Sequence, residues 1–195
     1  MPKISTEQIQ TLRQSTGVGL MDAKKALEEA EGDLVKAQEL LRKRGEKVTA
    51  SKANRVTEQG IVESYIHANQ KVGSVVVLLC ETDFVARTPE FQELAHELAI
   101  QVAATGACYV SPDEVPAEIV EKEKEVIRAQ VDSSKKPAIQ ESIIKGKLDK
   151  FFAEICLLKQ QYVKDDSMTI EEMMTSRVTK LGENIRIKEI GYFAI

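Results

Sequence analysis

The stretch VGSVVVLLCETDFVARTPEFQELAHELA, residues 72–99, decides the fold. It opens with a nearly continuous apolar run up to Cys80, which is typical of a deeply buried strand. Thr88 and Pro89 then supply an N-cap and a first helical residue. Apolar residues follow at helical spacing: Phe91, Leu94, Ala95, Leu98 and Val102. The stretch therefore predicts a buried strand, a turn, and a long helix that ends near Gly106.

The turn between this strand and this helix contains an acid next to a large aromatic residue, Asp83 and Phe84. Two interpretations are open from the residues alone. Phe84 either packs inward as a core residue or points outward at something else. Of the residues in the turn, Val85 is the one we expect to pack inward.

The other segments complete an α+β fold. Residues 60–69 and 72–81 read as a hairpin around the turn 69–71, and residues 184–195 read as a last strand that joins the first two. Helical patterns occupy the remaining segments: 116–131, 137–158 and 169–182. The predicted core is thus a small antiparallel sheet packed against helices.

Residues 4–45 predict three short helices. Ser5 and Gln8 match a capping box, and Gly17 is placed to end the first helix. Gly32 breaks the second helix, Asp33 caps the third, and Gly45 is expected to end it. Helices of this length form a minimal three-helix bundle with a small core.

The apolar periodicity is lost after the bundle, so we divide the chain into three segments. Residues 1–46 form the three-helix domain and residues 60–195 form the α+β core. Residues 47–59, which are polar throughout, are either a linker or a charged, solvated helix.

Composition narrows the class of protein. The chain has 195 residues and a net charge of −4, which argues against a dedicated nucleic-acid binder. Its longest apolar run is too short to span a membrane, and no signal sequence is evident at the N-terminus. Three cysteines without CxxC spacing indicate reduced thiols in a cytoplasmic protein. The two histidines, His67 and His96, pair with no cysteine at zinc-ligand spacing, so no metal is expected.

No catalytic motif stands out. The sequence has no GxGxxG, Walker A, HExxH or GxSxG pattern. A hydrolase would need Cys80 beside one of the histidines, but a cysteine at the end of an apolar strand usually behaves as a small hydrophobe. The acid pair Asp165–Asp166 reads as a solvated loop. We therefore expect a protein that is not an enzyme and holds no cofactor.

Three motifs carry a resemblance to a known family. They are TGVGLMDAKKALEEAEGDLVKAQELLRKRG (16–45), CETDFVAR (80–87) and KLGENIRIKEI (180–190). Together they resemble the elongation factor Ts family, guanine-nucleotide exchange factors for the GTPase elongation factor Tu. The resemblance runs along the whole chain and implies a cytoplasmic partner protein of Tu. It also implies that the N-terminal bundle is similar to ubiquitin-associated domains.

The resemblance assigns a role to the turn. In the family, the Asp-Phe of this motif enters the G domain of Tu beside the nucleotide's phosphates and magnesium ion. The matching residues are Asp83 and Phe84, flanked by Thr82 and Val85. The resemblance therefore favours an outward-pointing Phe84.

It also implies a second contact in the N-terminal module. The matching residues are Arg13 in the first helix and the loop Gly19-Leu20-Met21, where many relatives carry Met-Met. The alternative is that Leu20 and Met21 merely close the bundle. His67 is a weaker candidate for a partner contact, since a histidine in a comparable hairpin contacts Tu in the family. The alternative is that His67 is simply a solvent-exposed histidine of the turn.

Length suggests a further expectation. Longer members have a core of two similar halves, and this chain has room for one. We therefore expect two copies to associate, with the C-terminal strand IGYFAI (190–195) as the pairing edge. Other classes remain open: an adapter or chaperone-like module that binds without nucleotide exchange, and, third, a hydrolase.

Overall fold

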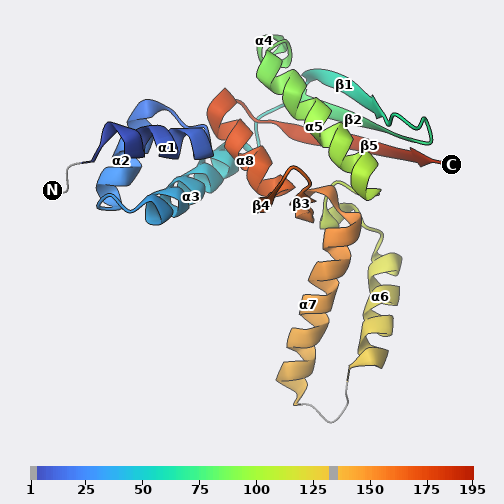
Figure 1. Cartoon of the computed structure of the whole chain (residues 1–195). Coiled ribbons are helices and arrows are strands. Elements are labelled where there is room, and N and C mark those ends of the chain that lie inside the picture. The colour runs from blue at the N-terminus through green and yellow to red at the C-terminus, as the bar shows by residue number, and fades with distance from the viewer. Residues whose placement is uncertain (1–3, 132–135) are drawn as a thin grey trace. The chain divides into compact units, whose positions relative to one another are not determined.

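A computed structural model describes residues 4–131 and 136–195 (Figure 1). The described chain is α+β, as predicted, and divides into two compact units. The first unit contains the chain up to Ile61, Leu78–Leu94 and Glu171–Arg186. The second contains Val62–Val77, Ala95–Ile170 and Ile187–Ile195.

The N-terminal bundle of the first unit consists of α1 (Thr6–Thr16), α2 (Leu20–Glu29) and α3 (Leu34–Lys52). Its core is small, and four of its seven buried side chains are alanine. The buried side chains are Leu12, Ala23, Ala26, Leu27, Ala30, Ala37 and Leu41. This confirms the three helices and their apolar faces, whereas the likeness to ubiquitin-associated domains stays a prediction.

Local capping sets the ends of these helices as the sequence predicts. Ser5 and Gln8 form the capping box: the Gln8 N–H donates to Ser5 Oγ over 3.1 Å, and the Ser5 N–H donates to Gln8 Oε1 over 2.9 Å. Gly17 ends α1 in the left-handed region, with a φ of 68° that favours glycine. The Asp33 carboxylate accepts the Val35 and Lys36 N–H groups at the start of α3, and these bonds lower its pKa.

The prediction that Gly45 ends the third helix is wrong. Helix α3 continues through Gly45 to Lys52, so the polar residues 47–52 are helical. Gly45 is buried because the helix passes close to Thr175 and Thr179. A Cβ at this position would lie 3.2 Å from Thr175 Cγ2 and 3.3 Å from Thr179 Oγ1. The glycine therefore permits a close approach and does not stop the helix.

A three-stranded sheet has the order β1-β2-β5, as predicted for the last strand. The strands are β1 (Gln59–Ile66), β2 (Val72–Cys80) and β5 (Arg186–Ala194). The Ile195 N–H donates to the Lys71 carbonyl, so β5 ends beside the start of β2 and runs antiparallel to it.

Helix α5 (Pro89–Thr105) begins and ends as predicted, and in the second unit it covers one face of the sheet (Figure 1). The Ser74 hydroxyl of β2 donates to the Ala99 carbonyl of α5 over 2.6 Å. Alternate residues of β2 are fully buried, among them Ser74 and Val76. Residues 75 and 77 lie on the opposite face and are only partly buried.

The second unit also contains two antiparallel helices that lie side by side, α6 (Ala117–Gln130) and α7 (Pro137–Ile155). Single 3₁₀ turns lie at Pro112–Glu114 and Leu157–Lys159. Two short strands follow, β3 (Gln161–Tyr162) and β4 (Asp165–Thr169), and they pair antiparallel. The expected loop at Asp165–Asp166 is therefore wrong, because these residues begin a strand.

The remaining helices are α4 (Asp83–Ala86) and α8 (Ile170–Leu181). Helix α8 confirms the prediction for residues 169–182. Helix α4 was not predicted and lies within the turn that follows β2. Among residues 4–131 and 136–195, no helix has the length and apolar character that a membrane span requires.

Candidate functional site

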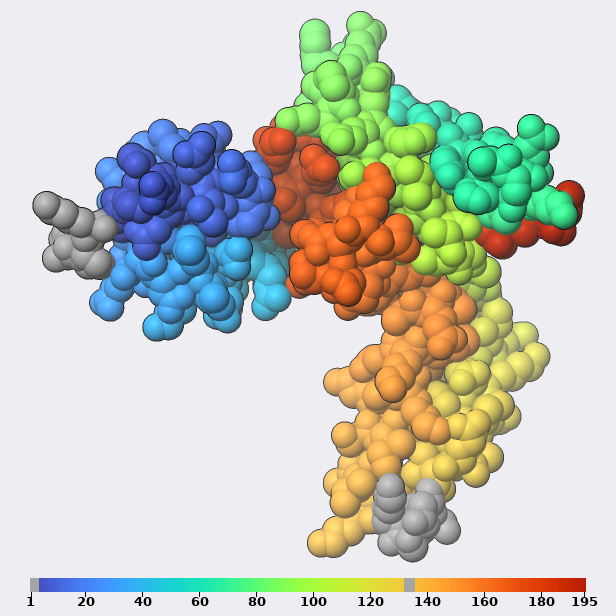
Figure 2. All heavy atoms as spheres, in the orientation of Figure 1, coloured from blue at the N-terminus to red at the C-terminus, as the bar shows by residue number. Residues whose placement is uncertain are grey.

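The turn that follows β2, residues 81–87, presents its aromatic residue to solvent. Thr82 is the N-cap of α4, and its hydroxyl accepts the Val85 N–H over 3.4 Å. Phe84 follows Asp83 in the single helical turn, and its side chain is 80% exposed. In Figure 2 the green atoms of this segment form a projecting tip. The interpretation of Phe84 as a core residue is therefore wrong.

The neighbouring residues account for this orientation. Ala86 is buried and Val85 is partly buried, so one side of α4 packs inward, as expected for Val85. In a single helical turn the side opposite Ala86 must face outward, and Phe84 occupies it. Asp83 lies beside Phe84, and its carboxylate pairs with Arg87 over 2.9 Å. The tip thus combines an exposed aromatic ring with a partly exposed acid.

A carboxylate from the end of the chain holds the base of the turn. Glu183 Oε2 accepts the Glu81 N–H over 3.1 Å and the Thr82 N–H over 3.0 Å. Glu183 Oε1 accepts the Thr82 hydroxyl over 2.6 Å. Sequence reasoning quoted the motif that contains Glu183 but gave this residue no role. Its position directly after Gly182, in a motif shared with the family, was the available signal.

The contact is reciprocal. The carboxylate of Glu81 accepts the Asn184 N–H over 2.6 Å and pairs with Arg55 over 3.5 Å. The Asn184 side chain is buried and donates to the carbonyls of Ala53 and Arg55 over 3.3 and 2.9 Å. We call the four residues Glu81, Thr82, Glu183 and Asn184 the carboxylate clamp.

Cys80 lies beneath the turn and is buried. Its thiol donates to the Thr82 carbonyl over 3.1 Å. Burial, together with the negative charge of Glu183, raises the pKa of this thiol to about 11. A thiol that stays protonated at neutral pH is a poor nucleophile. This argues against the hydrolase alternative.

The loop of the N-terminal module also presents apolar side chains. Gly19 is the N-cap of α2, and the two residues after it, Leu20 and Met21, are 55% and 59% exposed. Neither belongs to the buried core of the bundle, so the interpretation that they merely close the bundle is wrong. Arg13 is exposed beside this loop, and its Nε donates to the Val18 carbonyl over 3.4 Å.

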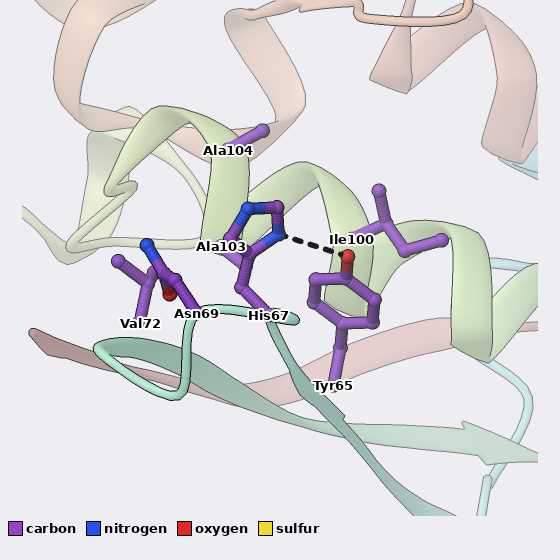
Figure 3. A pocket seen from close by; sticks show the side chains of 7 residues that line it. All are labelled: Tyr65, His67, Asn69, Val72, Ile100, Ala103 and Ala104. Atoms are coloured by element: carbon purple, nitrogen blue, oxygen red, sulfur yellow. Dashed lines mark hydrogen bonds between the residues drawn. The ribbon is translucent and has the colours of Figure 1, made fainter.

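His67 lies in the second unit, directly after β1, and is exposed. Its Nδ1 lies 3.2 Å from the Tyr65 hydroxyl, and both side chains line a shallow cavity of about 400 Å³ against α5 (Figure 3). His96 pairs with the Glu63 carboxylate over 3.0 Å. Neither interaction involves a thiol. Within the described residues, no cluster of three or more His, Cys, Asp or Glu side chains is placed to hold a metal ion.

Comparison with known families agrees with the three motifs. The family model described as Elongation factor TS matches residues 6–191. The chain belongs to the elongation factor Ts family. The match covers the three helices of the bundle, the 81–87 turn and β5 as far as Gly191. The protein is thus related throughout its length to translation elongation factors.

Relatives of similar length are found in several bacteria. Elongation factor Ts of Pseudothermotoga lettingae is 51% identical over 186 residues, which is 95% of this chain and 94% of the relative. That of Anaeromyxobacter dehalogenans strain 2CP-C is 50% identical, covering 100% of this chain and 90% of the relative. That of Thermotoga maritima is 48% identical over 99% of this chain and 96% of the relative. The short core is therefore shared by these relatives.

Proposed function

We propose that this protein is a guanine-nucleotide exchange factor that binds elongation factor Tu with GDP bound, promotes GDP release and allows GTP to enter. The observation that carries the proposal is the exposed Phe84 beside Asp83, on a turn whose base is fixed by the carboxylate clamp. Membership of the elongation factor Ts family supports the choice of partner. Thr82 and Val85 complete the turn that enters the partner.

In this mechanism, the exchange factor and GDP each lower the affinity of Tu for the other. A GTPase holds GDP through amide and lysine contacts of its P-loop and through a magnesium ion that bridges the phosphates. Asp83 and Phe84 insert beside these elements and displace them. Factor and GDP then lower each other's affinity by the same ratio in a ternary complex. No covalent bond is made or broken and no cofactor is required.

Phe84 alone is too small to account for exchange. Burial of one aromatic side chain contributes about 1.5–3 kcal/mol, and each tenfold change in release rate needs about 1.4 kcal/mol. A broader interface must therefore hold the distorted partner. Arg13, Gly19, Leu20 and Met21 form this second anchor, and His67 adds a further contact.

The domain limits and the location in the cell belong to the same proposal. The bundle of residues 1–46 serves as the anchor and residues 60–195 as the exchange core. Residues 47–59 connect them, beginning with the last turns of α3. The protein acts in the cytoplasm, where elongation takes place, without binding nucleic acid or membrane.

Release of fluorescently labelled GDP from purified Tu, with and without this protein, tests the function. An exchange factor accelerates release in proportion to its concentration until the complex saturates. An adapter or chaperone-like module binds Tu and leaves the release rate unchanged. That second result would exclude the proposal in favour of the adapter.

We also propose that two copies associate, giving an assembly of two Ts and two Tu chains. The support is an apolar surface in the second unit. Val62 and Ile66 of β1, with Phe193 of the edge strand β5, are large exposed side chains. Light scattering should give a dimer that Phe193→Glu weakens. A monomer, both free and with Tu, would contradict the association.

A further inference from the structure

Glu183 gathers three donors from the 81–87 turn, although it lies 101 positions after Thr82. Two donors are backbone N–H groups of successive residues, and the third is the Thr82 hydroxyl. A carboxylate has room for about four such bonds, and a charged acceptor strengthens each of them. No other acceptor contacts these two N–H groups among the bonds that the structure describes.

We propose that Glu183 is a positioning residue for nucleotide exchange: its carboxylate fixes the backbone of Glu81 and Thr82 so that Phe84 stays exposed. This inference rests on the proposed function. Glu183 does not itself contact the nucleotide or the partner's phosphate site. It acts through the turn.

The exposed ring needs such support for two reasons. A helix of four residues is far too short to be stable by itself, because its nucleation is unfavourable. Folding an exposed aromatic side chain back onto the protein surface also lowers the free energy, because apolar area is removed from water. Without a tertiary constraint, the turn would sample conformations in which Phe84 is covered.

A chain of hydrogen bonds transmits the constraint to α4. Glu183 accepts the Thr82 hydroxyl, and the same hydroxyl oxygen accepts the Val85 N–H. Such a chain orients each group through its neighbour. Asp83 and Phe84 lie between its two ends, so their backbone is held on both sides.

The position of Glu183 is fixed in turn. The next residue, Asn184, donates its N–H to Glu81 and its side-chain amide to the carbonyls of Ala53 and Arg55. The carboxylate clamp therefore attaches the turn to the segment directly after α3. A turn held in this way is preorganised and loses little conformational entropy when the partner binds.

The first experiment measures labelled-GDP release from Tu as a function of factor concentration. Glu183→Ala is expected to lower the maximal rate by about ten- to a hundredfold, the range for a misplaced reacting group, with little change in the half-saturating concentration. Glu183→Gln should restore most of the rate, because its amide oxygen accepts the two N–H groups and its NH₂ donates to Thr82 Oγ. Glu189→Ala, an exposed glutamate of β5, is the matched control and should behave as the parent protein.

Folding is controlled by circular dichroism, so that rates refer to folded protein. A Glu183→Ala protein that is folded and reaches the parent maximal rate overturns the inference. A variant that changes only the half-saturating concentration overturns it as well, because that result marks a binding contact. Should Glu183→Ala not fold, Thr82→Val removes the shared hydroxyl and should lower the maximal rate in the same direction.

The second experiment needs no partner. The chain has four tyrosines and no tryptophan, so Phe84→Trp places a single tryptophan at the tip, and excitation at the long-wavelength edge of its absorption avoids the tyrosines. Its anisotropy decay should gain a fast component when Glu183→Ala is added, and Glu183→Gln should suppress that component. Unchanged decay would overturn positioning whatever the exchange rates are. The Glu183→Ala variant could show increased mobility of the tip while the parent protein fails to accelerate GDP release from Tu. That result would support the positioning of the turn by Glu183 and refute the proposed function.

Discussion

Two tips of the first unit expose apolar side chains, and they are supported in different ways. Leu20 and Met21 lie in a bundle whose helix ends are set by nearby residues, such as Ser5 for α1 and Asp33 for α3. Phe84 lies on a turn whose backbone is held by Glu183, about a hundred positions away in the chain.

The difference concerns rigidity. The helix ends beside the N-terminal tip are set mainly within the bundle, with one added bond from α8, in which the Ser176 hydroxyl donates to the Thr16 carbonyl over 3.4 Å. The 81–87 turn is held by one carboxylate and by the segment after α3. Its conformation is therefore well defined, but a single substitution can release it. A partner that must be distorted requires a stiff tip, whereas an anchor requires only exposed apolar area.

The largest effects are expected at two phenylalanines that lie seven positions apart. Phe91 of α5 is fully buried, so Phe91→Ala should lower the free energy of unfolding by about 3–5 kcal/mol. Phe84→Ala should change it by less than about 0.5 kcal/mol, the usual range for surface positions. It should nevertheless slow GDP release by about ten- to a hundredfold. Urea unfolding and labelled-GDP release measure the two effects.

Asp83→Ala is the companion to Phe84→Ala and should also slow release while the fold stays intact. If Phe84→Ala destabilised the protein as strongly as Phe91→Ala, Phe84 would be a core residue in solution. The contrast between the two tips would then fail.

The elements that follow from local signals were predictable. The capping box at Ser5, the glycine at position 17 and Thr88-Pro89 each define a helix end through neighbours within a few residues. The apolar run of β2 likewise predicted its burial. The outward orientation of Phe84 followed only from the family motif, because an aromatic residue in a turn is otherwise ambiguous.

Two of the three features that sequence reasoning missed depend on distant residues. Gly45 read as a helix end because glycine is common there, yet its role is set by Thr175 and Thr179 of α8. Asp165 read as part of a loop, and its strand exists only through pairing with β3. Glu183 has no local signal for its partners. For Gly45 and Glu183 the deciding contact lies outside any window of neighbouring residues, whereas Asp165 pairs with Tyr162, three positions before it.

The reactivity of Cys80 measures how well the 81–87 turn shields the interior beneath it from solvent. Burial raises the pKa of Cys80 from 9.0 to about 11, and that of Cys156 likewise, so below pH 9 each has about a hundredfold less thiolate than a free thiol. Cys108 is exposed. A thiol reagent at pH 8 should therefore modify Cys108 first, and Cys80 only after denaturation.

The same shift implies a pH dependence. The folded state keeps these protons longer than the unfolded state, so their contribution to stability is complete below pH 9 and declines as the pH rises to about 11. Urea unfolding across this interval should show the decline. Rapid modification of Cys80 in the folded protein would mean that the base of the turn opens.

A smaller effect is expected at the N-terminal tip. Leu20→Ser and Met21→Ser each remove an exposed apolar contact and should weaken binding to Tu by about tenfold, because only part of each side chain is available for burial. The maximal release rate at saturation should be unchanged, since the 81–87 turn is untouched. Val35→Ser, at another exposed apolar position of the same bundle, is the matched control. A lowered maximal rate would make this tip part of the exchange step.

The smallest effect is expected where the bundle contacts α8. Arg42 of α3 pairs with Glu172 over 3.1 Å, and both side chains are substantially exposed. Solvent screens such a pair, so a double-mutant cycle with Arg42→Ala and Glu172→Ala should give a coupling of less than about 1 kcal/mol. The close approach at Gly45, by contrast, relies on packing that salt does not weaken. A coupling well above this value that disappears at high salt would show that charge, and not packing, attaches the bundle to α8.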